Sequence, residues 1–251
     1  MLWRVRTSRG RPKNAPAAFI QPCRPTVAKQ PPRGEGWVHE LKHDGYRLQI
    51  HVRDGRVKLY TMNAADWAKR YPHVVEQAAK IKGPAIIDAE VVWLDGEGVA
   101  QFEALHSRVT DHAAVACAFD LMMLDGNDLR RKPLAERKAT LRKVLRRTKG
   151  GIQYVEHVEG DGAEMFEAVC KLGLEGIVSK RIDAPYRSGP SKSWIKVNTR
   201  RHQQQHALLT EHSKRIFEPI CRPGTSPPMK WNKLCKFPAL VPALARIAAV
   251  N

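Results

Sequence analysis

The alternation of apolar and polar positions along the chain predicts that β-strands predominate. Segments with this alternation, or with short apolar runs, are residues 37–42, 47–52, 57–61, 85–93, 114–123, 176–179 and 194–197. Two of the connections contain Asp-Gly, at residues 44–45 and 54–55, which is typical of tight hairpins. We therefore expect the first three strands to pair antiparallel. Residues 1–36 are rich in Arg, Pro and Gly, and we interpret them as an extended, partly disordered lead, with structure beginning at Trp37.

Four segments instead repeat their apolar residues at helical spacing. These are residues 67–82, 101–108, 133–147 and 162–172. Gly83-Pro84 would end the first helix and Gly173 the last. Because strands outnumber helices and several are linked as hairpins, the expected fold class is α+β with antiparallel sheets, not a doubly wound parallel sheet.

Composition excludes several classes of protein. A chain of 251 residues with 43% hydrophobic content can bury a sizeable core. Its apolar runs are shorter than the roughly 18–20 residues that a membrane-spanning helix needs, and its basic start leads into Asn14-Ala15-Pro16 rather than a signal sequence. The five cysteines are odd in number and widely spaced, which favours free thiols over disulfides or zinc. We expect a cytoplasmic protein without a membrane segment.

The positive charge is concentrated at the two ends of the chain. Of a formal net charge of +18, residues 1–36 contribute eight basic residues against one acid, and residues 198–251 contribute nine against two. The centre is nearly balanced. We expect the basic flanks, 1–36 and 199–251, to contact nucleic acid, which would associate the protein with the nucleoid. The alternative is that the flanks are merely solvated tails.

One lysine has a setting that suits a nucleophile. Lys42 ends an apolar strand, and Arg47 follows on the next strand, so both side chains can face one cleft. A lysine becomes nucleophilic when burial or neighbouring cations lower its pKa. An ordinary hairpin with solvated charges is the alternative interpretation.

Acids and further cations lie near other strand ends. Asp88 and Glu90 share one strand face, and Glu175 begins another strand; such carboxylates can hold Mg²⁺ or form salt bridges. Lys180, Arg181 and Lys196 could converge on phosphates or face solvent. Taken singly, each of these signals is weak.

The order of these segments resembles that of the covalent nucleotidyltransferases, which include DNA ligases, RNA ligases and mRNA capping enzymes. Lys42-His43-Asp44-Gly45-Tyr46-Arg47 resembles their K-x-D-G-x-R motif. Four later motifs follow in the family's order: Asp88-Ala89-Glu90, Phe119-Asp120-Leu121, Glu175-Gly176-Ile177-Val178 and Trp194-Ile195-Lys196-Val197. Residues 119–126, 133–137 and 175–181 are most similar to the ligase module of bacterial non-homologous end-joining proteins.

The resemblance implies two antiparallel-rich sheets, flanked by helices, around a nucleotide cleft within residues 19–198. It also implies an ATP-dependent DNA ligase with Mg²⁺ or Mn²⁺, in which Lys42 takes AMP from ATP and passes it to a DNA 5′-phosphate before the 3′-hydroxyl seals the nick. The implied nucleotide contacts are Glu40, Leu41, Arg47, Glu90, Phe119, Lys180 and Lys196; the implied metal ligands are Glu90 and Glu175. Nicked or broken double-stranded DNA would be the partner of a monomer, with end-joining repair proteins nearby.

Some positions depart from the family pattern. Met62 and Ala64 stand where an arginine and a glycine are usual, Ala89 replaces a glycine, and Asn198 replaces a lysine. We expect residues 1–18 to be a basic lead and 199–251 a basic, atypical tail without the OB-fold domain that normally follows. His202, His206 and His212 lack metal-site spacing and belong to that polar tail. Two alternatives stay open: a catalytically weakened, nucleic-acid-binding remnant of a ligase, and an RNA ligase or capping-type transferase.

Overall fold

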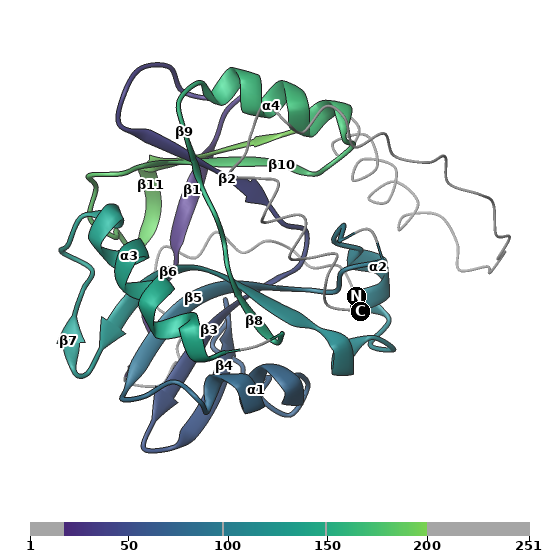
Figure 1. Ribbon diagram of the computed structural model, residues 1–251, viewed down its shortest axis with the longest axis vertical. Coiled ribbons are helices and arrows are strands. Elements are labelled where there is room, and N and C mark those ends of the chain that lie inside the picture. The colour runs from purple at the N-terminus through teal and green to yellow at the C-terminus, as the bar shows by residue number, and fades with distance from the viewer. Residues whose placement is uncertain (1–17, 97, 149, 200–251) are drawn as a thin grey trace, which may run out of the picture.

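Two β-sheets lie face to face, and a helix covers the outer side of each (Figure 1). The computed structural model describes residues 18–96, 98–148 and 150–199. The expectations for the tail, including its three histidines and the missing OB-fold domain, lie outside these residues, as does most of the expected lead.

The first sheet joins segments from both ends of the described chain. Its strands, in spatial order, are β1 (Cys23–Val27), β11 (Gly189–Asn198), β10 (Gly176–Arg181), β2 (Trp37–Lys42) and β9 (Val158–Glu159). Helix α4 (Gly162–Lys171) covers the outer face, where Met165 and Val169 pack against Ile177 and Val197. The Asp161 carboxylate caps this helix by accepting a hydrogen bond from the Ala163 amide at 2.8 Å.

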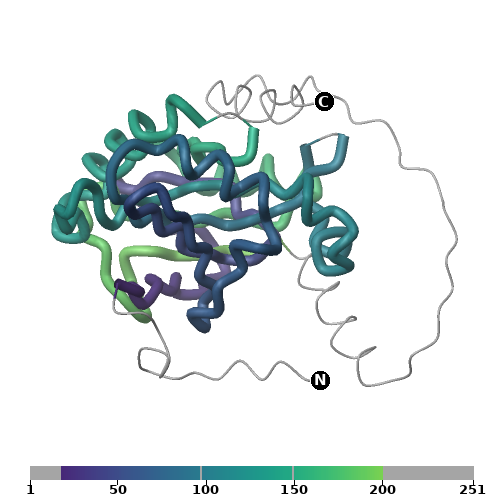
Figure 2. Tube along the Cα trace, turned by 90° about the horizontal axis from the view of Figure 1, so that it is seen from below, coloured from purple at the N-terminus to yellow at the C-terminus, as the bar shows by residue number. Residues whose placement is uncertain are grey.

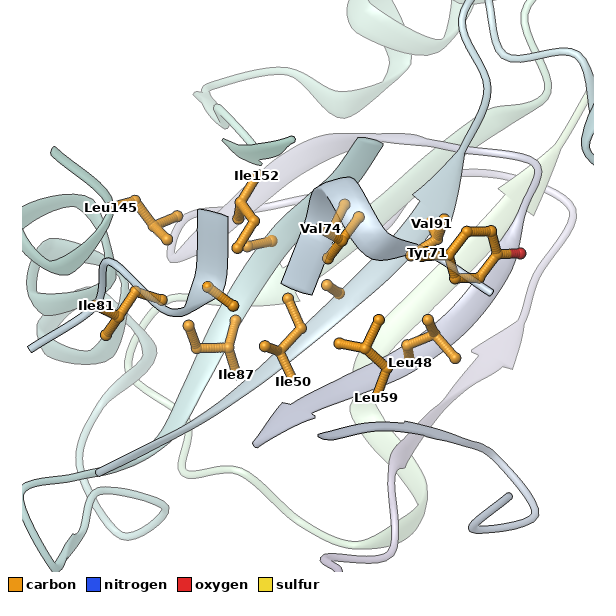
Figure 3. Packing of buried hydrophobic residues seen from close by; sticks show 14 of the residues in the cluster. Leu48, Ile50, Leu59, Tyr71, Val74, Ile81, Ile87, Val91, Leu145 and Ile152 are labelled. Atoms are coloured by element: carbon orange, nitrogen blue, oxygen red, sulfur yellow. The ribbon is translucent and has the colours of Figure 1, made fainter. Parts of the chain in front are cut away.

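The second sheet is contiguous in sequence and lies wholly between β2 and β9. Its strands are β4 (Arg56–Thr61), β3 (Tyr46–Arg53), β5 (Ala85–Val92), β6 (Val115–Leu124) and β7 (Asn127–Asp128), with β8 (Ile152–Tyr154) also paired to β6. Its helical elements are α1 (Pro72–Ala78), α2 (Phe102–His106), α3 (Leu134–Val144) and the short 3₁₀ turns η1 (Asp111–Ala113) and η2 (Leu145–Arg147). Val74 of α1 packs on Leu48, Ile50 and Ile87 in the main core (Figure 3).

The expected α+β class is confirmed, as are the strands expected from residue 37 onward, but the prediction that structure begins at Trp37 is wrong. Strand β1 lies before it, beside β11, as the purple and green tubes in Figure 2 show. Its sequence, Cys-Arg-Pro-Thr-Val, shows no alternation, and Pro25 is tolerated because β1 is an edge strand. The β1–β11 and β6–β8 pairs are parallel, so the sheets are mainly rather than wholly antiparallel. The short strands β7, β8 and β9 were also not predicted.

The helix expected over residues 67–82 is shorter, spanning Pro72–Ala78. Proline disfavours helical backbone at the preceding residue and fits the first helical turn, so Pro72 sets the start. Periodicity places Trp67 and Arg70 in the helix, but Trp67 lies in an irregular segment and Arg70 in the turn that follows it. The guanidinium of Arg70 lies over the Trp67 ring, 4.6 Å from its centre.

Two of the unusual residues have different backbone consequences. Ala64 has φ +60°, in the left-handed region, which explains why glycine is usual there. Ala89, by contrast, lies in the extended strand β5 with its side chain buried in the main core, so this position does not require glycine.

Two other observations bear on the composition. Of the described cysteines, Cys23 and Cys117 are buried and Cys170 is exposed, and all three are free thiols. None of the helices in the described ranges is long and apolar enough to cross a membrane.

Candidate active site

Strand alternation directs one set of side chains of the first sheet toward the second sheet. Leu41, Ile177 and Val197 point outward, because they pack with α4. Their neighbours along the strands therefore point inward. The inward side chains are those of Glu40 and Lys42 on β2, Lys180 on β10, and Trp194 and Lys196 on β11. This places Leu41 with its side chain away from the cleft, so only its backbone can contribute there.

The second sheet meets this set with its own polar row. Leu48 and Ala89 belong to the main core, on the outer side of the second sheet. Arg47, Asp88 and Glu90 therefore face inward, and Arg47 lies opposite Glu90 in the β3–β5 pair. Between the sheets, Cys23, Ile86, Met122, Tyr186 and Trp194 form a small apolar cluster with Phe119 packed against it.

Lys42 lies among carboxylates and is largely shielded from water. Its Nζ contacts the Glu175 carboxylate, and its side chain is 20% exposed. Burial lowers the pKa of Lys42 to about 8, with Lys196 acting in the same direction, while Glu90 and Asp44 oppose the shift. About a tenth of this amine is thus neutral at pH 7, far more than for a solvated lysine, and only the neutral form is a nucleophile.

Glu90 is perturbed in the complementary sense. Burial raises its pKa to about 7, although Arg47 and Lys42 both favour the ionised form. A carboxyl group that titrates near neutrality can exchange protons with its surroundings at working pH.

Arg47 bridges the two sheets through several contacts. Its Nε donates to Asp88 Oδ1 at 3.0 Å, its Nη2 to Asp88 Oδ2 at 2.7 Å, and its Nη1 to the Cys23 carbonyl at 2.6 Å. Tyr186 also donates its hydroxyl to Asp88 Oδ2 at 2.7 Å. The guanidinium lies 5.2 Å from the centre of the Phe119 ring. Arg47 is therefore fixed at the floor of the cleft.

Glu40 is buried between two ammonium groups. Lys138 of α3 contacts its Oε1 and Lys180 its Oε2, each at 2.5 Å. Burial opposes ionisation of Glu40, but the two lysines outweigh it and lower the pKa of the carboxyl. Lys180 also lies over the rings of Phe119 and Trp194, 4.4 and 4.1 Å from their centres.

The structure thus gathers most of the predicted residues. Those brought into the space between the sheets are Glu40, Lys42, Arg47, Glu90, Phe119, Glu175, Lys180 and Lys196. Arg181 lies elsewhere, since its guanidinium stacks on Trp37 and pairs with Asp183 at 3.0 Å.

Sequence reasoning missed the contributions of Lys138 and Tyr186. The buried positions of α3 are Leu134, Arg137, Lys138 and Leu141, a helical stripe in which two members are charged. Charged residues are normally read as exposed, so only the apolar ends of this stripe signalled burial. Tyr186 lies in the turn between β10 and β11, where no periodicity marks it.

The carboxylates of Glu90 and Glu175 could hold a divalent cation only together with water and substrate phosphates as further ligands. Within residues 18–96, 98–148 and 150–199, no group of three or more His, Cys, Asp or Glu side chains is arranged so that it could hold a metal ion by itself. Glu90 and Glu175 both neighbour Lys42. Mg²⁺ commonly takes one or two carboxylates and completes its shell with water and substrate phosphates, so this pair fits such a site.

Comparison with known proteins gives a consistent result. Residues 21–198 match the family described as ATP dependent DNA ligase domain. The multifunctional non-homologous end joining protein LigD of Pseudomonas aeruginosa is 37% identical over 191 residues, covering 74% of this chain and 23% of the relative. The SPbeta prophage-derived DNA ligase-like protein LigB of Bacillus subtilis is 30% identical over 202 residues, covering 78% and 73%.

Solved structures extend the comparison to three dimensions. The ligase domain of Mycobacterium tuberculosis LigD superposes with a TM-score of 0.63 at 30% identity, covering 71% of this chain and 59% of that one. Chlorella virus DNA ligase-adenylate, at 16% identity and a TM-score of 0.53, shares the fold, with 72% and 68% covered. This chain spans less than a quarter of the P. aeruginosa protein and under two thirds of the solved LigD ligase domain.

Proposed function

Because this chain belongs to the ATP-dependent DNA ligase family, we propose that it is a ligase-type adenylyltransferase whose nucleophile is Lys42. The observation that carries the proposal is the setting of this amine. It is shielded, its pKa is lowered to about 8 by burial and by the charge of Lys196, and it contacts the Glu175 carboxylate.

The proposed first step joins Lys42 to AMP. The neutral Nζ attacks the α-phosphorus of ATP, an N–P bond forms, and the bond between the α-phosphorus and the bridging oxygen breaks to release pyrophosphate. The amine loses one proton, for which the contacting carboxylate of Glu175 is the nearest acceptor. In the following steps AMP passes to the 5′-phosphate of a nick, and the DNA 3′-hydroxyl displaces it.

The surrounding residues suit the parts of the nucleotide. Phe119 offers an aromatic face to the adenine, Glu40 and the backbone of Leu41 offer acceptors and donors near it, and Glu90 suits the ribose hydroxyls. Arg47, Lys180 and Lys196 would hold phosphates, and their charge would stabilise the leaving pyrophosphate. Lys180 must then leave part of its contact with Glu40.

A divalent cation would be held by Glu90 and Glu175 together with ATP phosphates. Mg²⁺ or Mn²⁺ supplies charge neutralisation at the phosphates when it is bound. The two carboxylates lie beside Lys42, and Lys196 adds a positive charge near them from β11.

The substrate and setting follow from the same proposal. Nicked or broken double-stranded DNA is the proposed partner of a monomer, with end-joining repair proteins acting alongside it near the nucleoid. The basic flanks, residues 1–36 and 199–251, would contact the phosphate backbone of the DNA, which makes binding sensitive to salt.

A second candidate is a DNA-binding remnant with weakened catalysis. Met62, which is 37% exposed, and Asn198, at the end of β11, are uncharged at positions where the motif pattern that the sequence resembles has an arginine and a lysine. Both would remove phosphate-binding charge. This reading predicts DNA binding without adenylation.

The deciding experiment looks for a protein–AMP adduct. Purified protein, freed of bound AMP, is incubated with α-labelled ATP and Mg²⁺ or Mn²⁺, beside Lys42→Ala and the control Lys171→Ala, an exposed residue of α4. We expect an adduct in the wild type and in Lys171→Ala, and none in Lys42→Ala. If the folded wild type gives no adduct with either metal, the remnant is the better account. Labelling by GTP instead of ATP would indicate a capping-type transferase.

A further inference from the structure

Lys138 is a buried charge that the proposed chemistry does not use. It lies on α3, its side chain is 1% exposed, and it contacts Glu40 from the side opposite to Lys180. Burying an ammonium is costly unless it is paired and hydrogen-bonded, so its contacts must compensate for lost hydration.

The two lysines beside Glu40 are held differently. The Lys138 ammonium donates to Glu40 Oε1 at 2.5 Å and to the Val155 carbonyl at 3.0 Å, and it lies 4.7 Å from the centre of the Tyr154 ring. Lys180 reaches Glu40 Oε2 from the floor of the cleft, across the faces of Phe119 and Trp194. Lys138 is thus anchored outside the nucleotide cleft, whereas the contacts of Lys180 lie within it.

The charge balance supports this division. Burial opposes ionisation of both Glu40 and Lys138. Lys138 nevertheless lowers the pKa of Glu40, and Glu40 raises the pKa of Lys138, so that both stay ionised. Burial and the charge of Lys138 lower the pKa of Lys180. The ion pair between Lys138 and Glu40 can therefore persist when Lys180 turns toward a phosphate.

We propose that Lys138 is a positioning residue that holds the Glu40 carboxylate ionised and fixed in orientation, and thereby sets the preference for adenine over guanine. The inference rests on the proposed function, since it takes the cleft to bind a purine nucleotide. A fixed carboxylate accepts a hydrogen bond from the exocyclic amino group of adenine. It repels the carbonyl oxygen that guanine carries at the same position. Without Lys138, the carboxylate can rotate toward Lys180 and lose that orientation.

The test is equilibrium binding of the α,β-methylene analogues of ATP and GTP, which cannot transfer their nucleotidyl group. The variants are Lys138→Met, Lys138→Arg and Lys138→Gln, and the matched control is Lys143→Met, an exposed lysine of the same helix. We expect Lys138→Met to weaken binding of the adenine analogue about tenfold and to reduce the adenine-to-guanine ratio by a similar factor, as expected for one lost contact to a charged group. Lys138→Arg and Lys143→Met should keep the wild-type ratio.

Lys138→Gln covers the case in which the methionine variant fails to fold, because its amide can still donate to Glu40. It should reduce the ratio by about threefold. An unchanged adenine-to-guanine ratio in folded Lys138→Met or Lys138→Gln protein would overturn the inference. Failure of both variants to fold while Lys138→Arg folds would also overturn it, because Lys138 would then have a purely structural role. Wild-type protein that binds the adenine analogue selectively but forms no adduct would refute the proposed function alone. Adduct formation together with an unchanged ratio in folded Lys138→Met or Lys138→Gln would refute this inference alone.

Discussion

The lowered pKa of Lys42 predicts a particular dependence of adenylation on pH. With a pKa of about 8, the amine is neutral in about 9% of molecules at pH 7 and in about 91% at pH 9. The rate of adduct formation at saturating ATP should therefore rise about tenfold over this range and then level off. A solvated lysine with the ordinary pKa of 10.5 would instead show about a hundredfold rise with no plateau.

Single-turnover labelling with α-labelled ATP, between pH 6 and pH 10 at constant ionic strength, measures this profile. Lys196→Met provides a second arm, because Lys196 is one of the causes that lower the pKa of Lys42. Its removal should move the midpoint to higher pH. A rate that keeps rising tenfold per pH unit beyond pH 9, or that is flat from pH 6 to pH 9, would refute the reasoning.

Three further substitutions test the scaffold by chemical denaturation. Ala64→Gly should raise the free energy of unfolding by about 0.5–1 kcal/mol, since it relieves a left-handed alanine at some cost in chain entropy; an unchanged or lower value would contradict this. Gly45→Ala should lower it by about 1–3 kcal/mol or more, because the new Cβ would lie 2.1 Å from the Val91 carbonyl oxygen; a neutral effect would show that β3 can shift freely. Arg137→Met should lower the free energy of unfolding by about 3–5 kcal/mol, because it leaves the Asp120 carboxylate without its cation in a pair whose two side chains are fully buried. Adding Asp120→Asn should recover much of that loss.

Much of the set of inward-facing side chains could be predicted from alternation. A strand in which apolar Leu41 stands between charged Glu40 and Lys42 signals one face in the core and one in a cleft. The motif order then identified the partners of Lys42 on strands far away in the sequence, and the structure brings Glu90, Glu175 and Lys196 beside it.

The parts that could not be predicted depend on contacts between distant segments. Strand β1 has no pattern of its own and is stabilised by pairing with β11 and by Tyr186, whose hydroxyl accepts a hydrogen bond from the Cys23 amide at 2.8 Å. The burial of Lys138 likewise depends on Glu40, which lies 98 positions earlier in the chain. Local propensity carries no information about either partner.

The insertion of the whole second sheet between β2 and β9 has a consequence for biosynthesis. All strands of that sheet lie between residues 46 and 154, so they can pair as soon as this stretch has left the ribosome. Strand β2 emerges earlier but must wait for β10, and Lys42 meets Glu175 and Lys196 only after the last of the described strands has been made. We expect a nascent or truncated chain that ends between residues 155 and 174 to have a complete second sheet but a solvated, protonated Lys42. During synthesis, the Lys42 amine therefore becomes shielded from water only when β10 and β11 have joined β2 and the first sheet closes.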